Sequence, residues 1–317
     1  VAAGMGKLKP LNIPEVKGSF KSPVNVEIKD NKACDIFAGR YIKNVKNGAS
    51  PKWLQDWLKA VGQRPISALV DITNFFTIAY GRPLHVYDAD KLKGNINVRF
   101  AKQGEEVLAL DENTYKLCDI IPAICDDSGV IGMGGIMGGE TTAIDANTKN
   151  VFLECAYFNP VVISFAGQKL KVTSDARYRF ERGVDAKFVL NAECMATQMI
   201  LDLCGGEVSE QVVAGSEPDI SKVVEYRTSR PETLGGLKVE LAEQKEILER
   251  LGFIVDAKNI DVWQVKTPSW RHDIDAGEAD ITEEVLRIVG YDKIPVMPVI
   301  RNQQDGYPKQ TILQQRI

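Results

Sequence analysis

The chain has 317 residues, of which 44% are apolar and 26% charged, and its formal net charge is −4. This composition is typical of globular domains, so it excludes a disordered, collagen-like or coiled-coil protein. The negative net charge also excludes an overall basic field of the kind that drives nonspecific nucleic-acid binding. At roughly 150 residues per domain, the length predicts two domains.

The cysteine pattern and the length of the apolar runs indicate where in the cell the protein is expected to lie. The six Cys form no CxxC pair and the chain has two His, which argues against a structural zinc site. Singly scattered Cys are typical of reduced thiols in a cytosolic protein. No apolar run approaches the roughly 18 residues of a membrane span, and the first ten residues lack a signal-peptide core. We therefore expect a soluble, cytoplasmic protein without membrane contact.

In chain order, residues 1–30 are rich in Lys and Pro and predict a linker with an edge strand. Caps and apolar spacing predict four helices, beginning at 51, at 65, at Asn159–Pro160 and after Asp185. In the last of these, the residues at 188, 192, 195, 199 and 203 are expected to face the core. Alternating apolar runs predict strands at 36–45, 96–102, 108–117 and 150–158. Strands mixed with scattered helices favour an α+β fold with a mixed sheet over a doubly wound sheet.

Composition also suggests domain boundaries. We expect a first domain at 31–208 and a linker at 209–222, where Gly215, Ser216 and Pro218 lie. Residues 223–297 contain a helix (242–252), a strand (253–258), a hairpin candidate (262–268) and a second helix (280–290), an order typical of a small winged-helix-like α+β domain. Residues 298–317 have few apolar side chains and are interpreted as the truncated start of a next region. With no Met at position 1, the chain is expected to be an internal fragment of a longer polypeptide.

Two features of the first domain each allow two interpretations. The run GMGGIMGGE (132–140) lacks a Walker lysine and a following capped helix, so its glycines either bring backbone N–H groups to a ligand or allow close packing. Spacing alone favours packing. His85, between Leu84 and Val86, is either a structural residue or a base, and the structural interpretation is favoured.

Glu154 lies inside the apolar run VFLECAYF, with apolar neighbours on both faces of the predicted strand. Because an unpaired buried charge is costly, the carboxylate lies either in a pocket or in a buried ion pair. The run TSDARYRFERGVD (173–185) mixes three Arg with acidic residues. It favours an ion-pair network over a contact with a phosphate backbone.

Four acidic residues, Asp273, Asp280, Glu283 and Glu284, are candidate ligands of a hard cation. Three of them share one helix face at spacings of three and four. Acids in a first helical turn also favour the helix dipole, and Asp280 with Glu283 resembles a capping box. This second interpretation is favoured from the residues alone.

Five segments in order, at 64–92, 134–140, 150–160, 174–185 and 268–295, resemble the β subunit of bacterial phenylalanyl-tRNA synthetase. The resemblance spans roughly residues 30–297. It implies the middle of that subunit, without the tRNA-binding domain that precedes it or the catalytic-like and anticodon-binding domains that follow it. In that family, the domain matching 31–208 hydrolyses tyrosine wrongly esterified to the phenylalanine tRNA.

The resemblance also implies roles for single residues. A pocket for Phe cannot strongly reject an analogue that adds a hydroxyl, so a second site must recognise that hydroxyl. By the match, Glu154 recognises the tyrosine hydroxyl and Gly138 supplies a backbone contact. Ser174 and Ala176 form the pocket wall, and Ser174 stands where many relatives carry Thr, which keeps the hydroxyl but removes a methyl.

His85 and Arg64 match catalytic positions of the editing site. His85 either orients or deprotonates the attacking water, and assistance from the tRNA ribose hydroxyl is equally open.

The resemblance further implies a Mg²⁺ site shared with the α subunit and built from Asp273, Asp280, Glu283 and Glu284. One extra residue in HDIDAGEAD leaves Asp275 as an alternative to Asp273. The implied partners are phenylalanine tRNA and the α subunit, in an α2β2 assembly whose α subunit aminoacylates tRNA with ATP. The chain itself is not expected to bind ATP. The alternative to an editing enzyme is a non-catalytic scaffold that contacts the tRNA and the α subunit.

Overall fold

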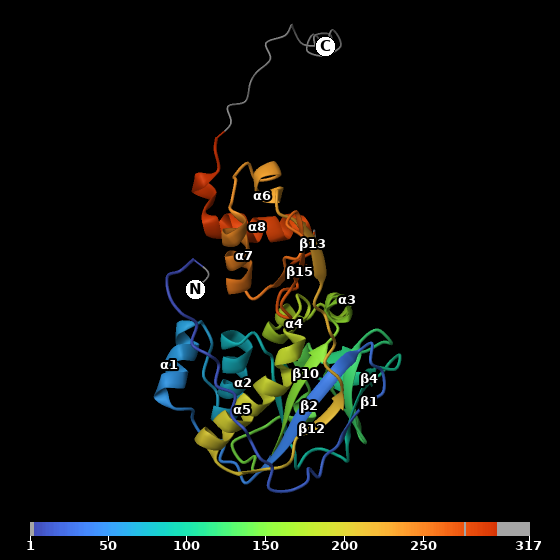
Figure 1. Cartoon of the computed structure of the whole chain (residues 1–317). Coiled ribbons are helices and arrows are strands. Elements are labelled where there is room, and N and C mark those ends of the chain that lie inside the picture. The colour runs from blue at the N-terminus through green and yellow to red at the C-terminus, as the bar shows by residue number, and fades with distance from the viewer. Residues whose placement is uncertain (1–2, 276, 297–317) are drawn as a thin grey trace, which may run out of the picture. The chain divides into compact units, whose positions relative to one another are not determined.

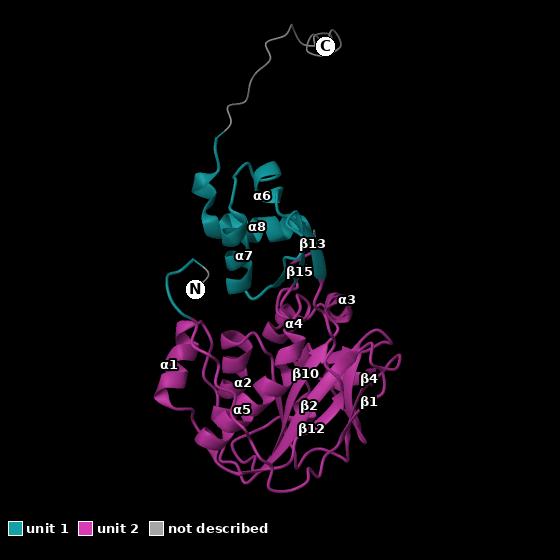
Figure 2. Cartoon of the chain, in the orientation of Figure 1, with its two compact units in different colours: residues 1–7, 223–266, 276–317 teal, residues 8–222, 267–275 magenta. Residues whose placement is uncertain are grey.

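The computed structural model describes residues 3–275 and 277–296, which form two compact units. The larger unit comprises residues 8–222 and 267–275, and the smaller is built on residues 223–266 and the described residues that follow 276 (Figure 2). The segment expected as the start of a next region, 298–317, lies outside the described residues. Among the residues described, no helix is long and apolar enough to cross a membrane.

The first sheet of the larger unit is antiparallel, with the strand order β11-β2-β10-β3 and β12 also paired with β2. Its strands are β2 (Cys34–Lys43), β3 (His85–Asp88), β10 (Val151–Phe158), β11 (Glu207–Val208) and β12 (Val212–Gly215). All eight residues of β10 are buried, which requires a cover on both faces. The continuous apolar run VFLECAYF supplies that pattern.

A second sheet covers one of these faces, in the order β1-β4-β7-β8-β9. Its strands are β1 (Val26–Ile28), β4 (Ile96–Phe100), β7 (Pro122–Asp126), β8 (Gly129–Met133) and β9 (Met137–Gly138). The edge strand β1 pairs with β4 in parallel, while the other pairs are antiparallel. The α+β class with a mixed sheet, predicted from the sequence, is confirmed.

Helices cover the other face of the first sheet (Figure 1). They are α1 (Lys52–Ala60), α2 (Ala68–Ala79) and α5 (Val189–Cys204), while α3 (Pro160–Leu170) and α4 (Asp175–Phe180) follow β10. Short 3-10 turns lie at Glu140–Thr142 and Ala186–Phe188. One apolar cluster therefore lies chiefly between the two sheets and another between the first sheet and the helices.

Three predicted elements differ in detail. The helix expected from 65 begins at Ala68, because the Asp71 carboxylate accepts a hydrogen bond from the Ile66 backbone N–H at 2.8 Å and holds that residue outside the helix. The run 108–117 forms a hairpin, β5 (Glu106–Leu108) with β6 (Thr114–Lys116), since residues 111–113 make the turn. The segment 209–222, expected as a linker, contributes β12 to the first sheet.

The buried face of α5 also differs from the expected one. Ala192, Ala196 and Ile200 are buried together with two polar residues, Glu193 and Thr197, while Met195 and Met199 are only partly buried. The apolar spacing missed this face because its polar members find partners inside the unit.

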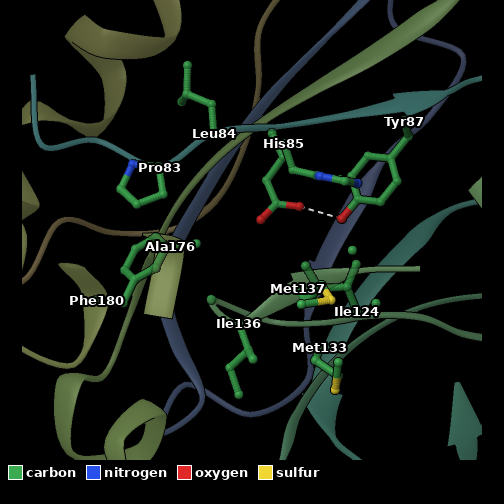
Figure 3. Close-up of a pocket in the computed structure, with 14 residues that line it drawn as sticks. Pro83, Leu84, His85, Tyr87, Ile124, Met133, Ile136, Met137, Ala176 and Phe180 are labelled. Atoms are coloured by element: carbon green, nitrogen blue, oxygen red, sulfur yellow. Dashed lines mark hydrogen bonds between the residues drawn. The ribbon is translucent and has the colours of Figure 1, made fainter. Parts of the chain in front are cut away.

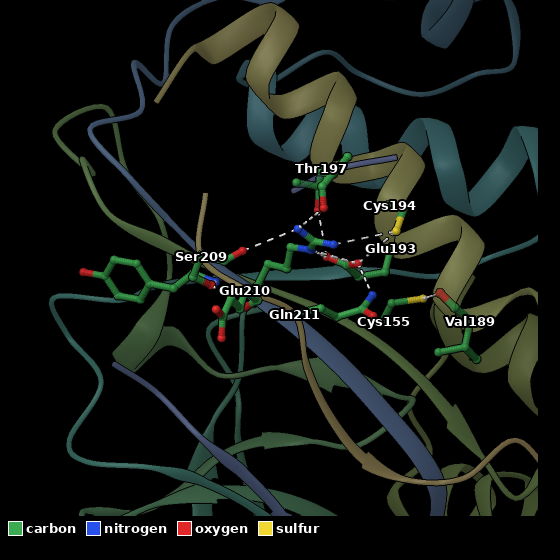
Figure 4. Close-up of polar contacts among 11 residues, drawn as sticks. Cys155, Val189, Glu193, Cys194, Thr197, Ser209, Glu210 and Gln211 are labelled. Carbon is green, nitrogen blue, oxygen red and sulfur yellow. Dashed lines mark hydrogen bonds and ion pairs between the residues drawn. The ribbon is translucent and has the colours of Figure 1, made fainter. Parts of the chain in front are cut away.

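Arg40 is the principal partner of Glu193. Its Nε lies 3.0 Å from Oε1 of Glu193, and both side chains are almost fully buried. Glu193 also accepts hydrogen bonds from Thr197 and Gln211, and Figure 4 shows these groups converging. Nη1 of Arg40 donates to the carbonyls of Val16 and Ser209, at 2.9 and 3.4 Å. The ion pair thus fixes three distant segments to the sheet.

The smaller unit has a three-stranded antiparallel sheet in the order β13-β15-β14. Its strands are β13 (Val223–Arg227), β14 (Ile254–Asp256) and β15 (Val262–Lys266), and its helices are α6 (Arg230–Thr233), α7 (Leu241–Arg250) and α8 (Glu278–Val289), with a 3-10 turn at Tyr291–Lys293. Tyr226 is fully buried and donates a hydrogen bond to Gln244 at 2.7 Å. A small α+β unit was predicted here, although β13 was not.

Candidate active site: a buried carboxylate in an apolar pocket

A cavity of about 70 Å³ lies in the larger unit between β3, β10, the glycine-rich segment and α4. Apolar side chains from these elements face it, including Ile136, Met137 and Phe180 (Figure 3). The polar side chains on its wall are those of His85, Tyr87 and Glu154. Binding sites commonly combine an apolar lining with a few convergent polar groups in this way.

Glu154 supplies the carboxylate of the pocket. It lies at the centre of β10, opposite His85 on β3, and is 6% exposed. No described residue forms an ion pair with it, so of the two interpretations left open by the sequence the structure shows the pocket. Burial raises the pKa of this carboxyl to about 7, although the hydrogen bond from Tyr87 acts in the opposite direction.

Tyr87 holds one oxygen of that carboxylate. Its hydroxyl donates a hydrogen bond to Oε2 of Glu154, drawn as the dashed line in Figure 3. The contact is possible because Tyr87 lies opposite Phe152 in the ladder, diagonal to Glu154 on the same face. Burial and the neighbouring carboxylate raise the pKa of Tyr87 well above its usual value, so the phenol stays protonated.

His85 borders the same cavity. Its ring contacts that of Tyr87 edge to face at a centroid distance of 4.4 Å. Nε2 is shielded from solvent and has no hydrogen-bond partner among the described groups. Burial lowers the pKa of His85 to about 4, so the ring is neutral at physiological pH and Nε2 is available to a ligand. A second cavity of about 230 Å³ shares Leu84 and His85 with the first.

The glycine-rich run forms part of the pocket wall through close packing. A Cβ on Gly138 would lie 2.3 Å from Cε1 of His85, and one on Gly139 would lie 2.4 Å from the Ile131 carbonyl oxygen. Gly134 and Gly135 are packed against Phe158 with similarly little space. The packing interpretation favoured from spacing therefore holds, and at Gly138 it also places the backbone beside the pocket.

The predicted wall residues behave differently from each other. Ala176 lines the cavity from α4. Ser174 caps α4, since its Oγ accepts a hydrogen bond from Arg177 N at 3.0 Å, and it donates to the carbonyl of Ile136 at 2.6 Å. Its hydroxyl therefore fixes a wall residue without itself lining the cavity.

Arg64 is exposed and does not line the cavity. Its neighbour Gln63 donates a hydrogen bond to Asp175, at the start of α4, at 3.0 Å. The sequence thus brings Arg64 near the wall of the pocket rather than into it. The arginines of 173–185 form an ion-pair network, as favoured from sequence: Arg177 and Arg182 pair with Glu181, and Arg179 pairs with Asp175.

Comparison with known proteins decides the family. The B3/4 domain matches residues 33–205 and the tRNA synthetase B5 domain matches residues 224–291. The chain belongs to the B3/4 domain family. It is also 50% identical over 304 residues to the phenylalanine–tRNA ligase beta subunit of Paramagnetospirillum magneticum, covering 95% of this chain and 38% of that protein.

The corresponding beta subunit of Novosphingobium aromaticivorans is 49% identical over 310 residues, covering 98% of this chain and 38% of the relative. Among solved structures, an N-terminal fragment of the phenylalanyl-tRNA synthetase beta subunit from Pyrococcus horikoshii matches with 20% identity and a TM-score of 0.41, covering 92% of this chain and 80% of that one. The resemblance to the synthetase beta subunit is confirmed, and the chain spans about 38% of the length of these curated relatives.

Among the described residues, no group of three or more His, Cys, Asp or Glu is placed to hold a metal. Asp273 belongs to the larger unit and is paired with Arg271 at 2.7 Å, while Asp275 is paired with Lys222. Asp280, Glu283 and Glu284 lie on α8 of the smaller unit, where Arg287 pairs with Glu284. The Mg²⁺ ligands that the resemblance implies therefore stay a prediction.

Tyr87 is the pocket residue that the sequence interpretation missed. Its signal was weak, because the sequence did not predict the strand His85–Asp88, which places Tyr87 on the same face as His85. Met133 and Met137 were also missed as wall residues, since thioethers in a glycine-rich run carry no distinctive chemistry.

Proposed function

We propose that the larger unit edits: it hydrolyses tyrosine mis-esterified to phenylalanine tRNA, as part of a phenylalanine–tRNA ligase beta subunit. One observation carries the proposal. The Glu154 carboxylate lies in an apolar pocket, forms no ion pair with any described residue and already accepts a hydrogen bond from a phenol. The chemistry that binds the Tyr87 hydroxyl is the chemistry that would bind the hydroxyl of a tyrosine substrate.

The same arrangement discriminates against phenylalanine. A phenylalanine ring in this pocket would remove water from the carboxylate and give it no donor in return. A buried acceptor left without its hydrogen bond costs about 1–3 kcal/mol, and more when it is charged. A tyrosine hydroxyl instead forms a charge-assisted hydrogen bond.

His85 is placed to act on the ester. When the phenol occupies the smaller cavity and the terminal ribose lies in the larger one, the ester bond is beside the ring that borders both. Neutral Nε2 accepts a hydrogen bond from water and orients it toward the ester carbonyl. The water attacks the ester carbonyl and gives a proton to Nε2, the ribose oxygen takes that proton as its bond to the carbonyl carbon breaks, and tyrosine and tRNA are released. Because a pKa of about 4 makes the ring a weak base, the 2′-hydroxyl of the ribose is a second candidate for the proton transfer.

The pocket must widen to admit a phenol. A dry cavity of about 150 Å³ holds a benzene molecule, whereas this one measures about 70 Å³. Met133 and Met137 line it, and unbranched thioethers adopt new rotamers at little cost. We propose that these side chains move when the substrate enters.

The wider context is proposed from the relatives. The chain acts with an α subunit in an α2β2 assembly and binds phenylalanine tRNA, in the cytoplasm. Aminoacylation with ATP and Mg²⁺ belongs to the assembled enzyme and its α subunit. Arg64, exposed near α4, is assigned to the tRNA end rather than to the phenol.

The test compares deacylation of Tyr-tRNA and Phe-tRNA, both on phenylalanine tRNA, by this chain. We expect selective hydrolysis of Tyr-tRNA, lost in Glu154→Gln, which keeps the size of the side chain but removes its charge. Tyr157→Phe serves as the control, since Tyr157 is buried on the same strand but does not line the cavity. Equal rates on the two substrates, or unchanged selectivity in Glu154→Gln, would contradict the proposal.

A second candidate is a scaffold that binds the tRNA and the α subunit without catalysis. The small cavity and the net charge of −4 favour it for the isolated chain, because weak RNA affinity limits editing in trans. Its signature is tRNA binding without hydrolysis at low salt. Selective hydrolysis by the chain itself excludes it.

A further inference from the structure

Glu154 has two carboxylate oxygens, and the structure uses one of them. Oε2 accepts the hydrogen bond from Tyr87, while no described residue donates to Oε1. An ionised carboxylate has about four lone-pair sites and can accept from two phenols at once. Among the described residues, one oxygen of this carboxylate therefore has a donor and the other has none.

Tyr87 cannot easily leave this position. Its side chain is 1% exposed and belongs to the apolar cluster between the sheets. Its strand is paired with β10 at Phe152, which fixes the backbone that carries the ring. A substrate phenol consequently cannot replace the Tyr87 hydroxyl and must use the other oxygen.

We propose that Tyr87 is a specificity-determining positioning residue, which holds Glu154 by Oε2 so that Oε1 is presented to the hydroxyl of the tyrosine substrate. This inference rests on the proposed function and names a residue that the family resemblance did not assign. It makes the recognising unit a pair: the carboxylate contacts the substrate, and the fixed phenol behind it sets the rotamer of that carboxylate.

The fixed phenol has a second effect on recognition. In the empty pocket it offsets part of the desolvation of the carboxylate, so the pocket stays intact between substrates. Without it, the side chain of Glu154 is free to turn toward another donor, and the oxygen that meets the substrate is no longer defined.

The test measures equilibrium binding of two small esters to the 317-residue chain by NMR titration. L-tyrosine methyl ester and L-phenylalanine methyl ester stand in for the two aminoacyl ends. Tyr87→Phe removes the hydroxyl and keeps the ring against His85. Tyr157→Phe is the matched control, because it removes a buried tyrosine hydroxyl that lies outside the pocket.

We expect Tyr87→Phe to lower the preference for the tyrosine ester about tenfold, the loss typical of one hydrogen bond to a charged group. Tyr157→Phe should leave the preference unchanged. In deacylation assays, the KM for Tyr-tRNA should rise in Tyr87→Phe while kcat stays within about twofold. A general loss of structure would instead lower kcat and affect both substrates.

A double-mutant cycle tests whether Tyr87 acts through Glu154. In a Glu154→Gln background, Tyr87→Phe should change the preference less than about twofold, because the charge that it positions is gone. An undiminished effect in that background overturns the proposal, as does tighter binding of the tyrosine ester by Tyr87→Phe, which would show that the two phenols compete.

The outcomes also separate this inference from the proposed function. Tyrosine-ester preference that depends on Tyr87, without hydrolysis of Tyr-tRNA, supports the inference and contradicts editing by this chain. Selective hydrolysis that Tyr87→Phe leaves unchanged supports editing and overturns the inference.

Discussion

Gly138 and His85 are packed so closely that a Cβ on the glycine would lie 2.3 Å from Cε1 of the imidazole and 2.8 Å from Nε2. Nε2 is the buried ring nitrogen that has no hydrogen-bond partner among the residues described. The backbone of β9 therefore sets the position of the His85 ring, and no residue other than glycine leaves the ring where it is.

Gly138→Ala should reduce deacylation of Tyr-tRNA at least tenfold, because the added methyl displaces His85 or narrows the cavity. Unfolding by urea should show a smaller effect, since the strain falls on one side chain at the pocket. Gly48→Ala is the control, because a Cβ there meets no atom within 4 Å. Full activity of Gly138→Ala would show that the position of the ring does not matter.

The buried carboxyl of Glu154 predicts a pH dependence of stability. Its pKa is about 7 in the folded protein and 4.5 in the unfolded chain, so folding favours the protonated form. Its contribution is therefore fully present below pH 4.5 and is lost as pH rises through 7, by about 3 kcal/mol in total. Glu154→Gln should remove this loss, which urea titrations at pH 5 to 8 would detect.

Titration of the groups around Glu154 does not interfere with the change in stability expected between pH 5 and 8. Tyr87, Cys34 and Cys155 interact electrostatically with it, and burial raises the pKa of each, so they titrate at higher pH. The pKa of His85 is lowered to about 4, so its contribution to folding stability has the opposite pH dependence and is lost as pH falls below 6.5. The difference between wild type and Glu154→Gln cancels its contribution. Parallel pH profiles for the two proteins would count against a carboxyl of raised pKa.

The hydroxyl of Ser174, rather than the size of its side chain, should determine how substitutions at this position change the free energy of unfolding. Ser174→Ala removes the cap of α4 and the hydrogen bond to Ile136, for an expected loss of about 1–2 kcal/mol. Ser174→Thr keeps the hydroxyl and should stay within about 0.5 kcal/mol of wild type. The measurement is urea unfolding of the three proteins side by side, and an equal loss in both variants would refute the capping role.

The Arg40–Glu193 pair predicts a larger effect. Arg40→Met leaves the Glu193 carboxylate buried without its cation and should cost about 3–5 kcal/mol. Arg40→Met combined with Glu193→Gln removes both charges and keeps an acceptor for Thr197 and Gln211, so it should recover most of that loss. Thermal unfolding of the single and double variants measures the recovery, and additive losses would argue that the pair is not coupled.

The sequence predicted the helices α1, α2, α3 and α5 and the strands β2, β4 and β10 because their signals are local. It did not predict β3, β7, β8, β9 or α4. Asn159 with Pro160 opens α3, with the Asn side chain accepting hydrogen bonds from Val161 and Val162 N. The apolar run 150–158 gives β10, at the centre of the first sheet. These signals require no knowledge of what the segments pack against.

The failures arise where tertiary partners override a local pattern. Glu193 lies off the apolar face that the sequence predicts for this helix. It is buried because Arg40, which is distant in sequence, forms an ion pair with it. The pocket is lined by four of the residues that the resemblance named, Glu154, His85, Gly138 and Ala176, and their roles stay predictions. Arg64 stays outside the cavity and Tyr87 was missed, because motif matching transfers known positions and cannot show which side chain satisfies a carboxylate.

The pairing of β12 with β2 has a consequence for biosynthesis. Val212 lies opposite Gly39, and β10 reaches β2 from residues 151–158, so the first sheet joins segments that leave the ribosome far apart in time. A nascent chain that has released β2 carries an open strand until β10 follows, and its sheet is complete only after β12 emerges. Such non-local pairing slows folding and leaves partly folded intermediates open to aggregation. Truncation upstream of residue 212 should therefore yield a chain that depends on chaperones.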